Sequence, residues 1–159
     1  MLIAQLLLLL VIANGTPIIA KKVLGHHFDR PVDANVRLFD GQPLFGATKT
    51  IRGILLSTVA TGACSSLIGL GWHIGFVVGV AAMAGDLLAS FIKRRLKKPP
   101  SSMAPGLDQV PESLFPLLAC KNLLSLSPLD ILILVIVFIL VELVLSKILY
   151  RWHIRAKPY

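Results

Sequence analysis

Charged residues are scarce in this sequence. Only 15% of its 159 residues are Asp, Glu, Lys or Arg, whereas about a quarter are charged in a typical soluble domain. Apolar residues make up 55%, the mean hydropathy is +0.80, and the apolar residues form long runs. Little charge together with long apolar runs argues against a globular core and predicts a single domain of membrane-spanning helices.

Aromatic and cysteine residues are also few. Aromatic residues account for 7% and form no stacking series among the basic residues, so the net charge of +8 does not indicate nucleic-acid binding. Cys64 and Cys120 lie in apolar segments, without the spacing of a zinc site or a disulfide framework. The N-terminal segment lacks the basic start and cleavage site of a signal peptide, so we expect it to be the first span.

Five apolar segments are candidates for crossing a bilayer, which takes about 20 residues. They cover approximately residues 2–20, 51–70, 72–92, 113–127 and 129–149. The fourth is short, contains Pro116 and carries Lys121 in its middle, so it is a short span, a tilted span or a half-inserted helix. We therefore expect an all-α polytopic membrane protein with about five transmembrane helices.

The basic residues predict the orientation of these helices. Loops 21–50 and 93–112 and the C-terminal tail carry Lys and Arg, whereas the N-terminus and the turn at 69–71 carry almost none. Positively charged loops stay in the cytoplasm, which places both loops and the C-terminus inside and the N-terminus outside. This orientation requires the fourth segment to cross. We expect a multi-pass protein of the cell (inner) membrane with its site facing the cytoplasm.

Polar residues interrupt the first apolar segment at Asn14-Gly15-Thr16-Pro17. Proline lacks a backbone donor and frees a carbonyl in the preceding turn. The segment is therefore either a simple kink or a place where backbone and amide groups open toward a polar cavity.

An acid lies within the third apolar segment. Asp86 precedes Lys93 by seven residues, a depth of about 10 Å at 1.5 Å per residue. Helical spacing puts Ser90, Lys93 and Lys97 on the same face as Asp86, and Arg94 flanks this face. The pattern favours a metal and phosphate site, with a structural Asp–Lys pair as the alternative.

The loops add further candidates. Thr48 or Thr50 is expected to cap the second helix, with Lys49 and Arg52 supplying positive charge near its start. Two acids at the start of the fourth segment, Asp108 and Glu112, complete the set. Carboxylates with several cations fit a Mg²⁺–polyphosphate substrate. A small non-enzymatic transporter or an assembly subunit remains the alternative, although a transporter would place its polar groups nearer the midplane.

Several of these stretches resemble the CDP-archaeol synthase family, which is related to the phosphatidate cytidylyltransferases. The matching stretches are residues 13–17, 31–33, 40–41, 45–53, 85–95 and 107–109. Gly85-Asp86…Ser90…Lys93-Arg94 is similar to the signature G-D-x-x-x-S-x-x-K-R, which a downstream acid follows. In the family, a second acid follows the downstream acid after three residues. Here the downstream acid is Asp108, and Glu112 comes four residues after it. Either Glu112 replaces the family's second acid as a metal ligand, or that ligand is absent.

The resemblance implies an enzyme that moves CMP from CTP to a membrane lipid phosphate with Mg²⁺. Asp86, Lys93 and Asp108 would be catalytic. Asp86 and Asp108 would hold the metal, together with Glu112 if it replaces the missing ligand. The implied nucleotide and phosphate contacts are Asn14, Lys49, Thr50, Arg52, Ser90 and Arg94, with Asp33 a weaker correspondence.

The reaction implied is attack of the lipid phosphate on the α-phosphorus of CTP, with pyrophosphate leaving. Positioning and charge neutralisation would be the protein's tasks. The acceptor is an ether lipid like archaetidic acid, an ester lipid like phosphatidic acid, or a polyprenyl phosphate. The expected partners are CTP, the lipid phosphate and the bilayer, with a homodimer as a further candidate and no nucleic acid.

Overall fold

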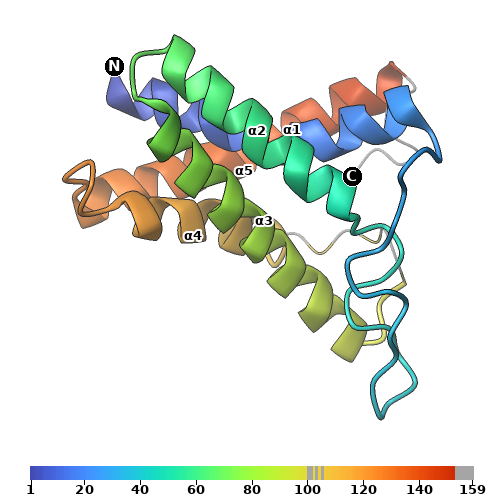
Figure 1. Ribbon diagram of the computed structural model, residues 1–159. Helices are drawn as coiled ribbons and strands as arrows, with labels where there is room; N and C mark the ends of the chain where they lie inside the picture. The colour runs from blue at the N-terminus through green and yellow to red at the C-terminus, as the bar shows by residue number, and fades with distance from the viewer. Residues whose placement is uncertain (100–101, 103, 105, 153–159) are drawn as a thin grey trace.

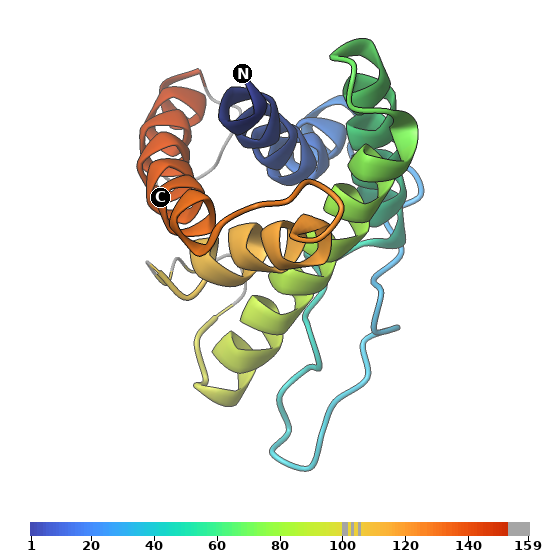
Figure 2. The same cartoon turned by 90° about the vertical axis from the view of Figure 1, so that its left-hand side faces the viewer.

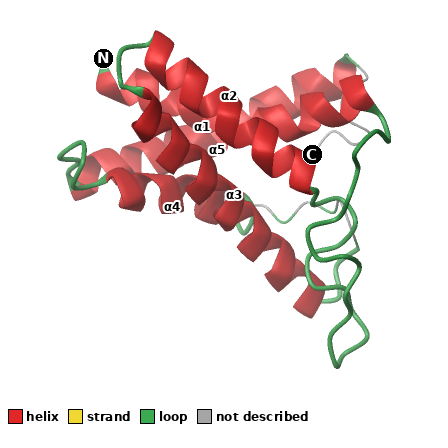
Figure 3. Cartoon of the chain, in the orientation of Figure 1, coloured by secondary structure: helices red, strands yellow, loops and turns green. Residues whose placement is uncertain are grey.

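A computed structural model describes residues 1–99, 102, 104 and 106–152 of the chain. These residues form five α-helices, whose arrangement is drawn in Figure 1 and Figure 3. The loops that join them contain two isolated β-bridges. The helices are α1 (Leu2–Leu24), α2 (Ile51–Leu67), α3 (Trp72–Arg95), α4 (Gln109–Cys120) and α5 (Pro128–Arg151). The predicted all-α class is confirmed.

The helices differ in whether they can cross a membrane. Among the described residues, α1, α3 and α5 are long and apolar enough to do so, and α2 is a shorter apolar helix. The 12 residues of α4 extend only about 18 Å at 1.5 Å per residue, against a hydrocarbon core of about 30 Å. Lys121, which was expected in the middle of the fourth segment, lies instead at the C-terminal end of α4 and is exposed.

The loops gather at the two ends of the helical bundle. The long loop between α1 and α2 lies at one end, beside the C-terminal ends of α1, α3 and α5 (Figure 1). The N-terminus, the turn between α2 and α3 and the turn between α4 and α5 lie at the other end. The bundle therefore has one end with long basic loops and one with short turns. We call these the basic end and the short-turn end.

A leucine-rich core fills the bundle toward the short-turn end. Leu6, Leu9 and Leu10 of α1 recur at helical spacing and are almost fully buried against Leu117 of α4 and Phe138 of α5. The buried residues of α2, in contrast, are mostly small or polar. These residues allow α2 to pack closely on α3.

Glycines of α3 set the separation between α2 and α3. A Cβ added at Gly75 would overlap the Thr61 carbonyl oxygen and the Ser65 side chain, and one at Gly79 would lie 2.8 Å from the Cα of Thr58. No real side chain tolerates such contacts. The two helices therefore touch through their backbones along this stripe.

We expect Gly75→Ala to destabilise the protein. The added methyl group forces α2 and α3 apart, and overpacking of this kind costs roughly 1–3 kcal/mol. The thermal unfolding midpoint in detergent should fall. Gly62→Ala is the matched control, because its Cβ would lie 3.6 Å from the nearest atom, the Trp72 carbonyl oxygen. Equal midpoints for the two variants would contradict this account of the contact.

Candidate active site

An ion pair lies inside the basic end of the bundle. Lys49, in the loop just before α2, places Nζ 2.5 and 2.6 Å from the two carboxylate oxygens of Asp86 on α3. Asp86 precedes Arg95, the last residue of α3, by nine positions, a depth of about 14 Å. The partner of Asp86 is thus a lysine from a distant loop rather than one from its own helix.

The charge of Lys49 is stabilised by its surroundings. Burial by itself lowers the pKa of Lys49, but the negative charge of Asp86, with contributions from Glu112 and Asp108, raises that pKa above its usual value. Lys49 therefore carries a full positive charge at neutral pH. Three acids from two other segments share this one cation.

A second acid contacts Asp86 from α4. A hydrogen bond joins the side chains of Glu112 and Asp86. The contact depends on Gly85, where a Cβ would overlap the carbonyl group of Pro111 and lie 2.8 Å from the Glu112 nitrogen. The first turn of α4 thus meets α3 backbone to backbone, with its partial positive charge beside the acids. Two carboxyl groups in contact must share either a proton or a cation.

The remaining residues of the third-helix pattern form a neighbouring cluster. Lys93 Nζ lies 2.6 Å from Asp108 Oδ1 and donates to the Ser102 carbonyl oxygen at 3.1 Å. Asp108 Oδ2 also accepts a hydrogen bond from the Ala104 nitrogen. Arg94 donates to the Pro99 carbonyl oxygen, and Ser90 is buried on the same helix. Asp86, Ser90 and Lys93 are therefore all buried or half-buried, as their spacing predicted.

Lys97 departs from this pattern. It was expected on the face of Asp86, but α3 ends at Arg95 and Lys97 is exposed. Its backbone adopts a positive φ of 54°. The Lys97 and Lys98 nitrogens donate to the carbonyl oxygens of Arg94 and Lys93, which is the hydrogen-bond pattern of a Schellman motif. That motif ends the helix before the periodicity reaches Lys97.

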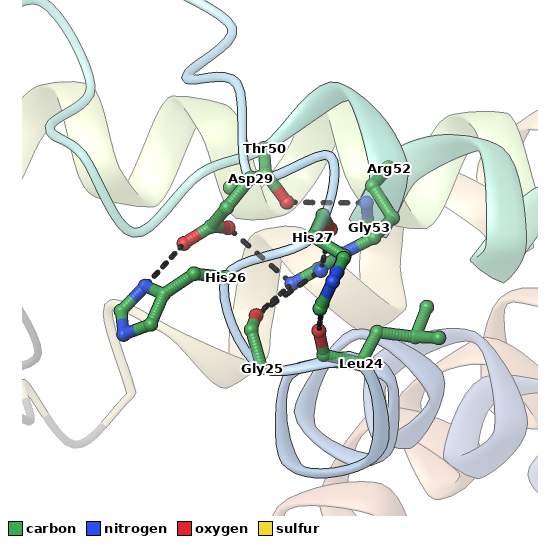
Figure 4. Close-up of polar contacts among 8 residues, drawn as sticks. All are labelled: Leu24, Gly25, His26, His27, Asp29, Thr50, Arg52 and Gly53. Atoms are coloured by element: carbon green, nitrogen blue, oxygen red, sulfur yellow. Dashed lines mark hydrogen bonds and ion pairs between the residues drawn. The ribbon is translucent and has the colours of Figure 1, made fainter.

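Arg52 fastens the start of α2 to the end of α1, as Figure 4 shows. Its guanidinium group donates to the carbonyl oxygens of Gly25 and His27 and to the Asp29 carboxylate. These acceptors account for much of its donor capacity. In this structure, Arg52 positions the beginning of the long loop.

Thr50 is the predicted cap of α2. Its Oγ1 accepts a hydrogen bond from the Gly53 nitrogen at 3.2 Å, which confirms the expectation for Thr50 rather than Thr48. The cap fixes where α2 begins. It thereby fixes the position of the adjacent Lys49.

Asp33 organises the remainder of the long loop. It is buried, and its carboxylate accepts hydrogen bonds from the nitrogens of Asn35, Phe45 and Gly46. Burial raises the pKa of Asp33, but these N–H groups lower it below its ordinary value. Gly46, three residues before Lys49, is therefore hydrogen-bonded to Asp33, which lies thirteen residues earlier in the chain.

The carbonyl group that Pro17 frees in α1 is hydrogen-bonded within the bundle. The Ala13 carbonyl, which Pro17 cannot serve, accepts a hydrogen bond from Ser57 of α2 at 2.6 Å. Asn14 donates to Leu10 of its own helix. Asn14 lies outside the lining of the Lys49 cavity described next, so the structure separates it from the other predicted site residues.

A cavity of about 440 Å³ adjoins the Lys49–Asp86 pair. Its lining includes five residues singled out above and one basic residue at the end of α1: Pro17, Lys21, Lys49, Thr50, Arg52 and Asp86. Ser90, Lys93, Arg94 and Asp108 are not part of this lining. The predicted residues thus fall into a Lys49 group around the cavity and a Lys93 group beside it.

The acids of the site could bind a metal ion only if a bound substrate supplied further oxygen atoms. Within the described part of the chain, no three His, Cys, Asp or Glu residues are grouped closely enough to hold a metal ion. Asp86 and Glu112 are in contact as a pair. Two carboxylates together with phosphate oxygens are a common way to bind Mg²⁺.

One intramembrane acid escaped the sequence prediction. Glu142 lies within the apolar run of α5 and is close enough to Glu112 to interact with its charge. An acid in a span is itself a signal, because its burial in hydrocarbon is expensive. Its relation to the site nevertheless depends on how α5 packs.

The sequence and fold of this chain are similar to those of known proteins. The CDP-archaeol synthase family model matches residues 63–159. The CDP-archaeol synthase of Sulfolobus acidocaldarius is 32% identical over 158 residues, which covers 94% of this chain and 91% of the relative. That of Pyrobaculum islandicum is 31% identical over 157 residues, covering 93% and 92%.

A solved structure extends the similarity to three dimensions. It is that of an intramembrane enzyme for archaeal membrane lipids biosynthesis, and it superposes with a TM-score of 0.72 at 29% identity. The alignment covers 87% of this chain and 90% of that one.

Fold and site together define an all-helical membrane-embedded enzyme with charged side chains buried at one end of its bundle. The chain belongs to the CDP-archaeol synthase family. The resemblance drawn from the sequence is thereby confirmed.

We expect Asp33→Ala to expose the long loop to proteases. The substitution leaves the Phe45 and Gly46 nitrogens without their acceptor, at a cost of about 1–3 kcal/mol. Tryptic cleavage at Arg37 should accelerate by roughly tenfold or more, since 1.4 kcal/mol corresponds to a factor of ten. Asp33→Asn keeps a carbonyl acceptor and should cause a smaller increase. Unchanged cleavage of Asp33→Ala would show that Asp33 does not hold the loop.

Proposed function

We propose that this protein is a CTP-dependent cytidylyltransferase that moves CMP from CTP to a membrane lipid phosphate and releases pyrophosphate. Its relatives are CDP-archaeol synthases over nearly the whole chain. The observation that carries the proposal is the meeting of Lys49, Asp86 and Glu112, from three different segments, beside a cavity at the basic end. We take the acceptor to be an archaetidic-acid-like ether lipid, with an ester lipid as the variant to be tested.

The chemistry needs positioning more than it needs a protein nucleophile. The lipid phosphate is already an anion, so its oxygen can form the new bond to the α-phosphorus while the bond to pyrophosphate breaks. The protein must hold both phosphates in line and offset their charge. Lys49 and Lys93 each bind a carboxylate in this structure, and phosphate oxygens can take the place of those carboxylates.

The other predicted residues divide between the two groups. Thr50 and Arg52 line the cavity with Lys49, and we propose that this side receives the nucleotide. Ser90 and Arg94 flank Lys93 on α3, and we assign them to phosphate contacts there. Asn14 lies apart from both groups, so we propose that it acts on the lipid side of the site.

Magnesium is the cofactor that fits the acids best. Asp86 and Glu112 would hold the ion, with Asp108 as the third acid of the predicted set. Their contact in a buried place leaves a negative charge that a cation can neutralise. When bound, Mg²⁺ would supply charge neutralisation at the phosphate oxygens. Lys49, which is paired with Asp86 in this structure, would contribute its positive charge to binding the triphosphate.

We propose that the site faces the cytoplasm of a multi-pass protein of the cell membrane. The ends of α1 and α3 carry Lys21, Lys22, Lys93, Arg94 and Arg95 at the same side of the bundle as the long loop. Basic residues flanking spans favour the cytoplasmic side. CTP is available there, whereas the lipid can approach within the bilayer.

Asp86→Asn should abolish CTP-dependent pyrophosphate release by the purified protein in detergent with Mg²⁺. The amide removes the negative charge that pairs with Lys49, and we expect at least a 100-fold loss, the scale of a lost electrostatic group in a catalytic site, about 10²–10³. Asp130→Asn is the control, because Asp130 is a half-buried residue at the start of α5, at the short-turn end, where it forms the capping box with Ser127.

A panel of acceptors completes this assay. Ether-lipid, ester-lipid and polyprenyl phosphates are compared with wild-type protein. A transporter or an assembly subunit would release no pyrophosphate with any of them and would need no CTP. A well-folded wild-type sample that neither binds CTP nor turns over would refute the proposed function.

Glu112→Gln should raise the Mg²⁺ concentration needed for half-maximal turnover. The substitution removes one of the two acids in contact, and we expect an increase of roughly tenfold, at the lower end of the effects seen when a metal's surroundings are altered. A Mg²⁺ titration of pyrophosphate release measures it, with Asp130→Asn again as the control. An unchanged Mg²⁺ requirement would remove Glu112 from the metal site.

A further inference from the structure

A second cavity lies between α1 and α5, on another side of α1 from the Lys49 cavity. It is partly open, and the space of about 340 Å³ includes the region outside its mouth. Apolar residues form most of its walls, among them Val11 and Ile18 of α1 and Leu145 and Leu149 of α5. Asn14, Gly15, Glu142 and Ser146 add a polar patch. We call this space the α1–α5 cleft.

The polar patch of the cleft lies at the depth of the proposed active site. Glu142 precedes Arg151, the last residue of α5, by nine positions, as Asp86 precedes the last residue of α3. Both acids are therefore about 14 Å from the basic ends of their helices at 1.5 Å per residue. A ligand whose polar end reached Glu142 would be level with Asp86.

Glu112 interacts with an acid from the lining of each cavity. It is hydrogen-bonded to Asp86, which lines the Lys49 cavity, and it interacts with the charge of Glu142, which lines the cleft. The Asn14–Pro17 segment of α1 lies between the two cavities, because Pro17 lines the Lys49 cavity and Gly15 lines the cleft. The cleft thus leads from apolar helix surfaces toward the acids.

The position and size of the cleft restrict what can occupy it. Among the elements in the described residues, α5 packs against α4 and α1 only, and Figure 2 shows it at the edge of the bundle. The cleft is narrow and partly open, so it can take an extended chain but not a helix of a second copy. An extended hydrocarbon chain fits both the apolar walls and this edge position.

We propose that the α1–α5 cleft binds a hydrocarbon chain of the acceptor lipid and directs the lipid's polar end past Glu142 toward the cations. This inference rests on the proposed function. The phosphate itself is held beyond the cleft, because the described lining of the cleft includes no Lys or Arg, whereas Lys49 and Lys93 lie beyond it. Nucleotide and lipid therefore approach the acids from different sides of α1.

Gly15→Leu tests the cleft directly. No atom lies within 4 Å of a Cβ built at Gly15, so the backbone is undisturbed while the larger side chain fills the space. We expect the KM for the lipid phosphate to rise roughly tenfold or more, the scale on which hydrophobic pockets discriminate one methylene. The Kd for CTP should stay at the wild-type value. Ala63→Leu, which adds the same side chain at an exposed position of α2, should change neither constant.

A second variant fills the cleft from its other wall. Leu145→Trp on α5 should raise the same KM, and it replaces Gly15→Leu if that variant does not purify as a folded protein. A wild-type KM for the lipid in the folded variant or variants would overturn the cleft assignment, as would a CTP Kd that rises in step with the lipid KM. Absence of turnover by wild-type protein with every lipid phosphate would instead count against the proposed function.

Discussion

The negative charge of Asp86 inside a membrane-spanning helix is the constraint on which the basic end of this protein depends. A carboxylate in a span is costly unless it is paired, and Lys49 supplies the pair from a loop. That loop therefore belongs to the membrane domain rather than being an independent appendage. Asp33, Thr50 and Arg52 each fix a different part of the loop, and together they present Lys49 to Asp86.

The short helix α4 follows from the same constraint. A continuous span would place only side chains beside Asp86, whereas α4 begins at its depth and brings its first turn to Gly85. Irregular backbone at membrane depth is tolerated where protein buries it or a cavity is lined by it. At the start of α4, Asp108 is bound to Lys93 and accepts a hydrogen bond from the Ala104 nitrogen.

Two cavities of different character flank the middle of α1. The polar one is lined by Lys49 and Asp86, and the largely apolar one lies against α5. A reaction between a soluble nucleotide and a bilayer lipid requires access from both phases. Pro17 cannot donate a hydrogen bond to the Ala13 carbonyl of α1, and the Ser57 hydroxyl donates one instead. The backbone of α1 is therefore satisfied between the cavities. This helix can thus separate two ligands without exposing its own backbone.

The sequence alone determined the all-α class, the long apolar helices and the family, because apolar runs, basic flanks and the Gly85–Arg95 pattern are properties of contiguous residues. Local rules also limited the cap of α2 to Thr48 or Thr50, and the structure shows that it is Thr50. The same rules wrongly placed Lys97 on the face of α3 that carries Asp86. The Schellman motif ends the helix before that residue.

Only the tertiary structure decided which charges meet. It paired Asp86 with Lys49, placed Glu112 in contact with Asp86 and Asp108 with Lys93, and brought Glu142 near Glu112. These partners come from segments far apart in the chain, and their distances are set by close helix packing at Gly85 and Gly75. Spacing along one helix cannot report contacts between helices, because those depend on how closely whole backbones approach.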